Sequence, residues 1–160
     1  MKFDFRITGS SHGEFVGAEA SPFEPGFHVN PEKLNAFMQR RAPGRSNITS
    51  KRNEPDEIEF ISGITDGILD GKRLVLKIKN RDVKKSDYSV LGGAVRPGTS
   101  DLTAKLKYGR DYDNSGSSRF SGRMTAPMCA LGGIVLQILE SQGITVSAEL
   151  KSVGTSENRE

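Results

Sequence analysis

The sequence predicts a single domain of the α+β class, because stretches with the two-residue period of strands and stretches typical of helices occupy separate parts of the chain. Its 160 residues are enough for one hydrophobic core. Hydrophobic residues make up 34% and charged residues 27%, a balance typical of globular chains, while 18 glycines indicate long loops. We expect the domain to span residues 1–154 and the polar residues 155–160 to fray.

Alternation of apolar and polar residues predicts the strands. Every second residue from 3 to 7 is apolar, which predicts the first strand. This strand ends just before residues 9–13, where we expect a turn. Three further strands are expected, over residues 57–62, 74–80 and 144–151.

Two helices are predicted, over residues 30–41 and 125–142. Asn30 is suited to cap the first, which has a proline in its first turn and arginines in its last. The second is apolar nearly all round, with Thr125 as its expected cap and Gly143 at its end. That composition is typical of a core helix.

Residues 82–122 show no regular period and are interrupted by glycines. A loop this long in a small domain is functional or disordered, and its charged motifs favour function. At the end of this loop, residues 115–123 combine serines and glycines with Arg119 and Arg123 before the second helix. Backbone N–H groups, hydroxyls and guanidinium groups there suit a phosphate or carboxylate. The alternative is a flexible loop with solvated arginines.

Composition narrows the class of partner. The net charge is only +3, and no basic run or aromatic ladder accompanies the arginines, so a small phosphorylated or carboxylated molecule is expected rather than nucleic acid. Two histidines and one cysteine without ligand spacing argue against a bound metal. Cys129 is expected to be a buried, unreactive thiol. Charges within residues 2–6 and a longest apolar stretch of only 126–139 predict a cytoplasmic protein without a signal peptide or membrane span.

His12 lies in the turn after the first strand and is a candidate general acid near neutral pH. A lone histidine in a turn is more often structural, so the residues alone leave both interpretations open, and His28 is expected to be structural. Other cations next to turns are candidate anion ligands, with solvated salt bridges as the alternative: Arg41, Arg45, Arg96 and Lys107.

Eight blocks, in this order and at these separations, resemble the N-terminal half of chorismate synthases: residues 9–13, 40–46, 52–56, 80–82, 86–88, 96–101, 107–109 and 119–126. The resemblance implies a β-α-β sandwich, of which this chain would hold about half. It implies a lyase of the shikimate pathway, in aromatic amino acid biosynthesis. That enzyme eliminates phosphate from 5-enolpyruvylshikimate 3-phosphate to give chorismate, requires reduced FMN, and is usually a homotetramer.

The resemblance also implies roles for particular residues. His12 matches the histidine thought to protonate the leaving phosphate. Matches to positions that contact FMN are Arg41, Arg119, Ser121 and Thr125. Matches to positions expected to bind the phosphorylated carboxylate substrate are Arg45, Arg96, Lys107 and Arg123.

Departures from the family pattern fall at the same site. Thr99 replaces the second family histidine, Ser10 replaces a glutamate and Phe120 replaces a serine. Three hypotheses follow. The chain is part of an enzyme whose flavin site is completed by a complementary C-terminal half, or it is a degenerate relative that binds a ligand or partner without turnover. The third, an RNA-binding domain, lacks the stacking aromatics it would need.

Overall fold

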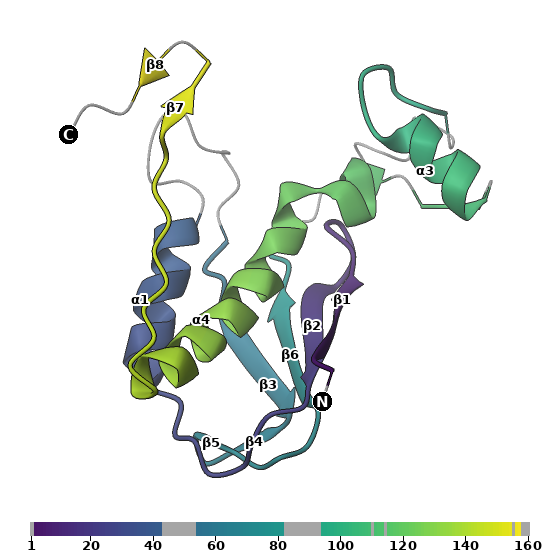
Figure 1. Cartoon of the computed structure of the whole chain (residues 1–160). Helices are drawn as coiled ribbons and strands as arrows, with labels where there is room; N and C mark the ends of the chain where they lie inside the picture. Colours follow the sequence, from purple (N-terminus) through teal and green to yellow (C-terminus); the bar gives the residue numbers. More distant parts are fainter. Residues whose placement is uncertain are drawn as a thin grey trace.

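The computed structural model describes residues 2–42, 54–81, 94–109, 111–113, 115–154 and 156–157. Two helices, α1 (Pro31–Arg41) and α4 (Thr125–Ser141), pack on one face of a four-stranded sheet (Figure 1). The sheet contains β1 (Asp4–Gly9), β2 (Phe15–Ser21), β3 (Ile58–Ser62) and β6 (Leu74–Lys79). This two-layer arrangement confirms the predicted α+β class.

The sheet has the order β1-β2-β6-β3, and each neighbouring pair is antiparallel. In the central pair, Val16 lies opposite Ile78 and Ala18 opposite Leu76, all four buried beneath the helices. Side chains alternate between the faces of a strand, so the other face is charged. There Arg73 donates a hydrogen bond to Asp4 over 2.7 Å, and this bond lowers the pKa of the Asp4 carboxyl.

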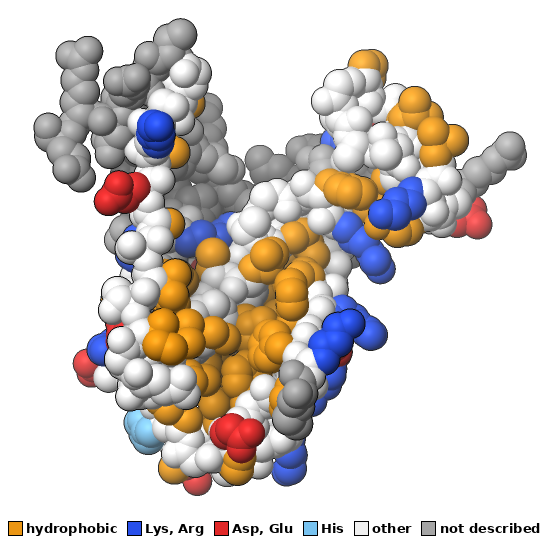
Figure 2. Space-filling view, in the orientation of Figure 1, with side chains coloured by type: hydrophobic (Ala, Val, Ile, Leu, Met, Phe, Trp, Pro, Cys, Tyr) orange, Lys and Arg blue, Asp and Glu red, His pale blue; other side chains and the backbone are white. Residues whose placement is uncertain are grey.

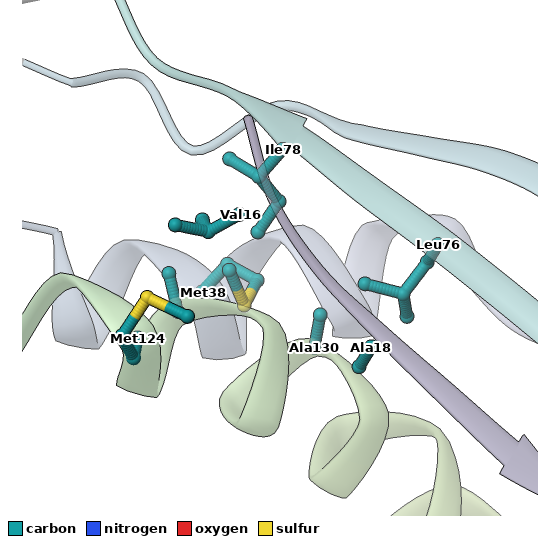
Figure 3. Packing of buried hydrophobic residues seen from close by; sticks show 8 residues of the cluster. Val16, Ala18, Met38, Leu76, Ile78, Met124 and Ala130 are labelled. Carbon is teal, nitrogen blue, oxygen red and sulfur yellow. The ribbon is translucent and has the colours of Figure 1, made fainter. Parts of the chain in front are cut away.

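The core lies between the sheet and the two helices. Figure 3 shows side chains of β2 and β6 pointing toward Met38 of α1, toward Met124 just before α4, and toward Ala130 of α4. A second cluster joins Leu34 of α1 and Ile134 of α4 to the sheet. Burial of each of the larger apolar side chains, such as Met38 and Leu34, contributes about 1.5–3 kcal/mol. The helices are therefore fixed against the strands that carry the candidate site.

The start of α1 confirms its predicted cap. The Asn30 side chain accepts a hydrogen bond from the Lys33 N–H over 2.9 Å. Gln137 of α4 then binds the Asn30 backbone twice, accepting from its N–H over 2.8 Å and donating to its C=O over 3.1 Å. The cap of one helix is thereby tied to the face of the other.

The expected cap of the second helix was wrong. Thr125 is the first residue of α4, not its cap, and its hydroxyl donates to the Gly122 C=O over 2.6 Å. Two short 3₁₀ turns precede α4, namely η1 (Ser115–Phe120) and η2 (Gly122–Met124). Ser121 caps η2 by accepting from the Arg123 N–H over 3.3 Å.

The predicted strand over 144–151 was also wrong. These residues are extended and exposed, but no strand pairing includes them in the part of the chain that the structure describes. A short hairpin of β7 (Ser152–Val153) and β8 (Ser156–Glu157) follows. Within the tail that we expected to fray, residues 156–157 are thus paired, and residues 158–160 lie outside the described residues.

Other elements were missed. Alternation of apolar and polar residues did not predict β2, because Val16, Gly17, Ala18 and Ala20 are all buried at the centre of the sheet. Within the expected loop over 82–122, the structure contains α3 (Asp101–Tyr108) and the turn η1. A small hairpin of β4 (Ile64–Thr65) and β5 (Ile68–Leu69) also carried too few residues for a period to show.

The contact between α1 and α4 predicts opposite effects for two adjacent glycines. A Cβ at Gly133 would lie 2.7 Å from Leu34 Cδ1 and 3.1 Å from Phe37 Cδ1, whereas a Cβ at Gly132 meets open space. Gly132→Ala should raise the free energy of unfolding by about 0.5–1 kcal/mol through helix propensity. Gly133→Ala should lower the free energy of unfolding by about 1–3 kcal/mol, because the added methyl group overpacks the contact with α1. Urea unfolding measures both, and equal stabilities would contradict this packing.

Candidate functional site

The turn that carries His12 joins β1 to β2. Gly9 has φ +77°, and a Cβ there would lie 2.2 Å from the Phe15 carbonyl oxygen, so only glycine suits this position. Within the turn, the Gly13 N–H donates to the Ser10 C=O over 3.1 Å. His12 is half-buried, with its Nδ1 atom turned into the protein.

Asn80, immediately after β6, holds this turn in place. Its Nδ2 amide donates to the Ser10 C=O over 3.0 Å and to the Gly13 C=O over 2.8 Å. Its backbone N–H donates to the Glu14 C=O over 3.1 Å. One side chain from a neighbouring strand thus fixes the carbonyls on both sides of His12. Asn80 was not among the predicted site residues, although its position at the end of the strand predicted over 74–80 was a usable signal.

Arg123 in turn orients Asn80. Its Nε donates to Asn80 Oδ1 over 2.9 Å and its Nη2 to the Lys79 C=O over 3.3 Å. Its Nη1 is bound to Asp56, and Nη2 lies 3.6 Å from Glu54 Oε2. The side chains of Arg123, Asp56 and Glu54 are 2%, 0% and 0% exposed. These contacts direct the Arg123 guanidinium group to the interior. The predicted substrate contact of Arg123 stays a prediction.

Asp56 connects this network to the predicted flavin residues. It also pairs with Arg41, whose Nε lies 3.5 Å from Thr125 Oγ1. We therefore define the Asp56 network as Asp56, Glu54, Arg41, Asn80 and Arg123. It joins the His12 turn to the start of α4. It thereby links predicted site residues from three separate parts of the sequence: His12, Arg41, and the group Ser121, Arg123 and Thr125.

The hydrogen bonds of the Asn80 side chain to the His12 turn predict a loss of stability when this side chain is removed. Asn80→Ala leaves two carbonyls of the turn and Arg123 Nε without this partner, so the free energy of unfolding should fall by about 2–3 kcal/mol. The matched variant Asn35→Ala, on the exposed side of α1, should change it by less than about 0.5 kcal/mol. Chemical denaturation distinguishes the two variants. Equal losses in the free energy of unfolding would show that the Asn80 side-chain hydrogen bonds contribute nothing to stability.

A second group of predicted residues lies on α3, on η1 and in the segment just before α3. Arg96 is held by Asp101 through two side-chain hydrogen bonds of 2.8 Å each. Thr99 is exposed and donates to the Arg96 C=O over 3.0 Å, while it accepts from the Asp101 N–H over 3.3 Å. The threonine hydroxyl is therefore engaged at the start of α3.

An aromatic cluster, defined as Tyr108, Tyr112 and Phe120, lies beside two of the predicted cations. The Tyr108 and Tyr112 rings stack at 5.4 Å, and Phe120 lies 6.4 Å from each. The Arg119 guanidinium lies 6.0 Å and the Lys107 ammonium 5.3 Å from the Tyr108 ring centre. Tyr108 and Phe120 are about half exposed, at 47% and 48%. This surface offers ring faces and positive charge together.

Arg45 lies outside the described residues, as do the blocks at residues 52–53 and 82–93. The predictions for these positions stay predictions.

Cys129 lies between this site and the core, and burial raises the pKa of its thiol. A higher pKa leaves less of the reactive thiolate at any given pH. Iodoacetamide should thus modify Cys129 in the native protein at least about tenfold more slowly than in the urea-unfolded chain at pH 8. Mass spectrometry follows the reaction, and equal rates would contradict a shielded thiol.

The chain matches known proteins over nearly its full length. A family model described as chorismate synthase matches residues 3–160. The chain is 40% identical over 148 residues to the chorismate synthase of Lancefieldella parvula, covering 92% of this chain and 39% of that protein. It is 41% identical over 147 residues to that of Syntrophobacter fumaroxidans, covering 90% of this chain and 41% of that protein.

The fold gives the same likeness. A solved structure named as a crystal structure of chorismate synthase matches with a TM-score of 0.60 and 23% identity, over 89% of this chain and 36% of that one. The chain therefore spans about two fifths of the length of the relatives that it matches.

Proposed function

Because the chain belongs to the chorismate synthase family, we propose that it supplies the His12 side of an active site for the family reaction, the elimination of phosphate from 5-enolpyruvylshikimate 3-phosphate to give chorismate. One observation carries the proposal. The half-buried His12 is held in a turn that Asn80 and Arg123 fix against the start of α4. A proton donor needs this kind of fixed geometry, because a general acid must lie within hydrogen-bond distance of the leaving group.

In this proposal His12 donates a proton to an oxygen of the leaving phosphate. Asn80 and the Asp56 network hold the turn and act as positioning residues, because their polar atoms contact each other rather than open space. Arg41, the last residue of α1, reaches Thr125 at the start of α4, where backbone N–H groups favour an anion. The substrate is expected to bind between His12 and this helix start.

The aromatic cluster fits one side of a flavin. Exposed faces of Tyr108 and Phe120 suit a flat ring system, and Arg119 and Lys107 suit its phosphate. When bound, reduced FMN supplies electron density to the substrate as phosphate leaves. Residues of this chain would cover only part of such a group, since the described rings and cations lie on an open surface.

A second function, ligand binding without turnover, is favoured by Thr99. This residue stands where the family pattern has a histidine, and its hydroxyl is engaged by Arg96 and Asp101. Such a protein would keep the anion site but lack one proton-transferring group. It would bind the substrate and release it unchanged.

One assay separates the two functions. The chain is co-purified with the part of the Lancefieldella parvula enzyme that has no counterpart in it, and mixed anaerobically with reduced FMN and 5-enolpyruvylshikimate 3-phosphate. Chorismate formation, followed by absorbance, supports the family reaction. Substrate binding by calorimetry without chorismate supports the binding function and contradicts the enzymatic one.

A further inference from the structure

A hollow between α1 and the edge strand β3 lies away from the candidate site. Its volume is about 420 Å³, within the range of pockets that hold small molecules. Its floor is apolar and includes Val29, Leu34 of α1, Phe60 of β3 and Ile64 of β4. Figure 1 shows β4 and β5 near the end of the domain at which α1 begins. The hollow is separate from the hydrophobic area that Figure 2 shows over α4, since no residue of α4 is among the described residues that line it.

The floor of this hollow is an open edge of the hydrophobic core. Leu34 is only 3% exposed and belongs to the second core cluster. Ile58, Phe60 and Ile64 pack against the same cluster but are each partly exposed. An apolar ring that enters the hollow would remove these surfaces from water, and the hydrophobic effect therefore favours its binding.

One carboxylate sets the charge of the hollow. Among the described residues that line it, Asp66 carries the only carboxylate, and none is a lysine or an arginine. Asp66 lies in the turn between β4 and β5 with φ +52°, and Gly67 follows with φ +79°. The Gly67 C=O accepts a hydrogen bond from the Val29 N–H over 2.9 Å, which ties the turn to the floor. A fixed carboxylate beside an apolar floor suits a ligand that carries an ammonium group on an apolar body.

The two walls of the hollow lead to the Asp56 network. Arg41, the last residue of α1, follows Leu34 by seven residues, which places it about 10 Å further along the same side of the helix. Asp56 precedes Ile58, the first residue of β3, by two residues. Because Arg41 and Asp56 are paired, one ion pair joins the helix wall to the strand wall. The separation of α1 and β3 therefore affects both the hollow and this ion pair.

We propose that the hollow is a regulatory site for a small apolar molecule with an ammonium group, and that its occupancy is coupled to the ion pair of Arg41 and Asp56. The occupant would fix the separation of α1 and β3 that the ion pair requires. Such coupling is reciprocal, so the intact ion pair should strengthen binding in the hollow by the factor with which binding strengthens the pair. The regulated site is that of the proposed function, but neither binding nor coupling depends on turnover.

Three probes that share one ring and differ in charge test the binding. Benzylammonium, benzyl alcohol and benzoate are titrated into the isotope-labelled chain at about pH 8, where histidine side chains are neutral, and amide shifts are followed by NMR. We expect benzylammonium to bind with a Kd of about 5 mM or tighter and to shift the amides of the hollow. Benzyl alcohol should bind roughly threefold more weakly because it lacks the charge, and benzoate more weakly still.

Substitutions at the hollow locate the site. Asp66→Asn should abolish the preference for benzylammonium over benzyl alcohol. Glu59→Gln is the matched control, because Glu59 is an exposed carboxylate of β3 that does not line the hollow, and it should leave the preference unchanged. Asn35→Trp adds a large ring at the edge of the hollow on α1 and should prevent the binding of all three probes. Circular dichroism checks that each variant keeps the fold of the unmodified chain.

Arg41→Met tests the coupling, because Arg41 does not line the hollow. It should weaken the binding of benzylammonium about fivefold or more. Arg40→Met is the matched control, since Arg40 lies over the Phe37 ring at 5.6 Å, and it should leave the affinity unchanged.

Four results would overturn the proposal: no binding of benzylammonium, a preference that survives Asp66→Asn, binding that survives Asn35→Trp, or equal affinities of the Arg41→Met and Arg40→Met chains. Failure of chorismate formation alone would contradict the enzymatic function and leave this regulatory site intact.

Discussion

Arg123→Met should lower the free energy of unfolding by about 3–5 kcal/mol, the effect of removing one partner from a buried ion pair. The methionine fills much of the same space but leaves the carboxylates of Asp56 and Glu54, both 0% exposed, without this cation. Asn80 Oδ1 loses its donor in the same step. Because Asp56 retains Arg41, we expect the protein to unfold cooperatively at a lower urea concentration rather than to be unfolded from the outset.

Arg119→Met is the matched control. Arg119 lies exposed over the Tyr108 ring, so the same substitution there should change stability by less than about 0.5 kcal/mol. If the two variants unfold at the same urea concentration, the Asp56 network is not a source of stability and the geometry of the site must depend on other contacts.

His12→Asn should reduce chorismate formation about 10²–10⁴-fold in the complex with the remainder of a relative, the range for loss of a general acid. The variant should bind substrate with similar affinity, because a proton donor acts mainly in the transition state. Rates come from the anaerobic assay under reduced FMN, and binding comes from calorimetry.

The chain provides its own control in its second histidine. His28 is exposed, and its only described strand-like pairing is a single bridge to Ile68, so His28→Asn should leave the rate unchanged. Similar rates for His12→Asn and the unmodified chain would contradict a catalytic role for His12.

Local sequence signals predicted the parts of the fold that depend on local interactions. Asn30 and the proline after it predicted the start of α1, and the apolar run after Thr125 predicted α4. The turn containing His12 followed from the strand before it and from Gly9. In each case the hydrogen bonds or steric limits that define the element involve residues close in sequence.

The sequence could not reveal contacts between distant residues. Arg123 reads as a loop arginine facing a ligand, yet Asp56, 67 residues earlier, binds it in the interior. Asp56 adopts φ +51°, a left-handed conformation that no pattern predicted. The alternation over 144–151 was real, but alternation alone supplies no neighbouring strand.

Asn80 and the other residues of the Asp56 network hold the His12 turn as one rigid unit. Amide hydrogen exchange of Gly13 tests it most directly, since the Gly13 N–H donates to Ser10 within the turn and Asn80 binds both carbonyls. In Asn80→Ala, protection of Gly13 should fall roughly tenfold or more relative to that of Val16 in β2. If the ratio of the two protection factors does not change, the turn is held without the Asp56 network and is not part of one rigid unit with it.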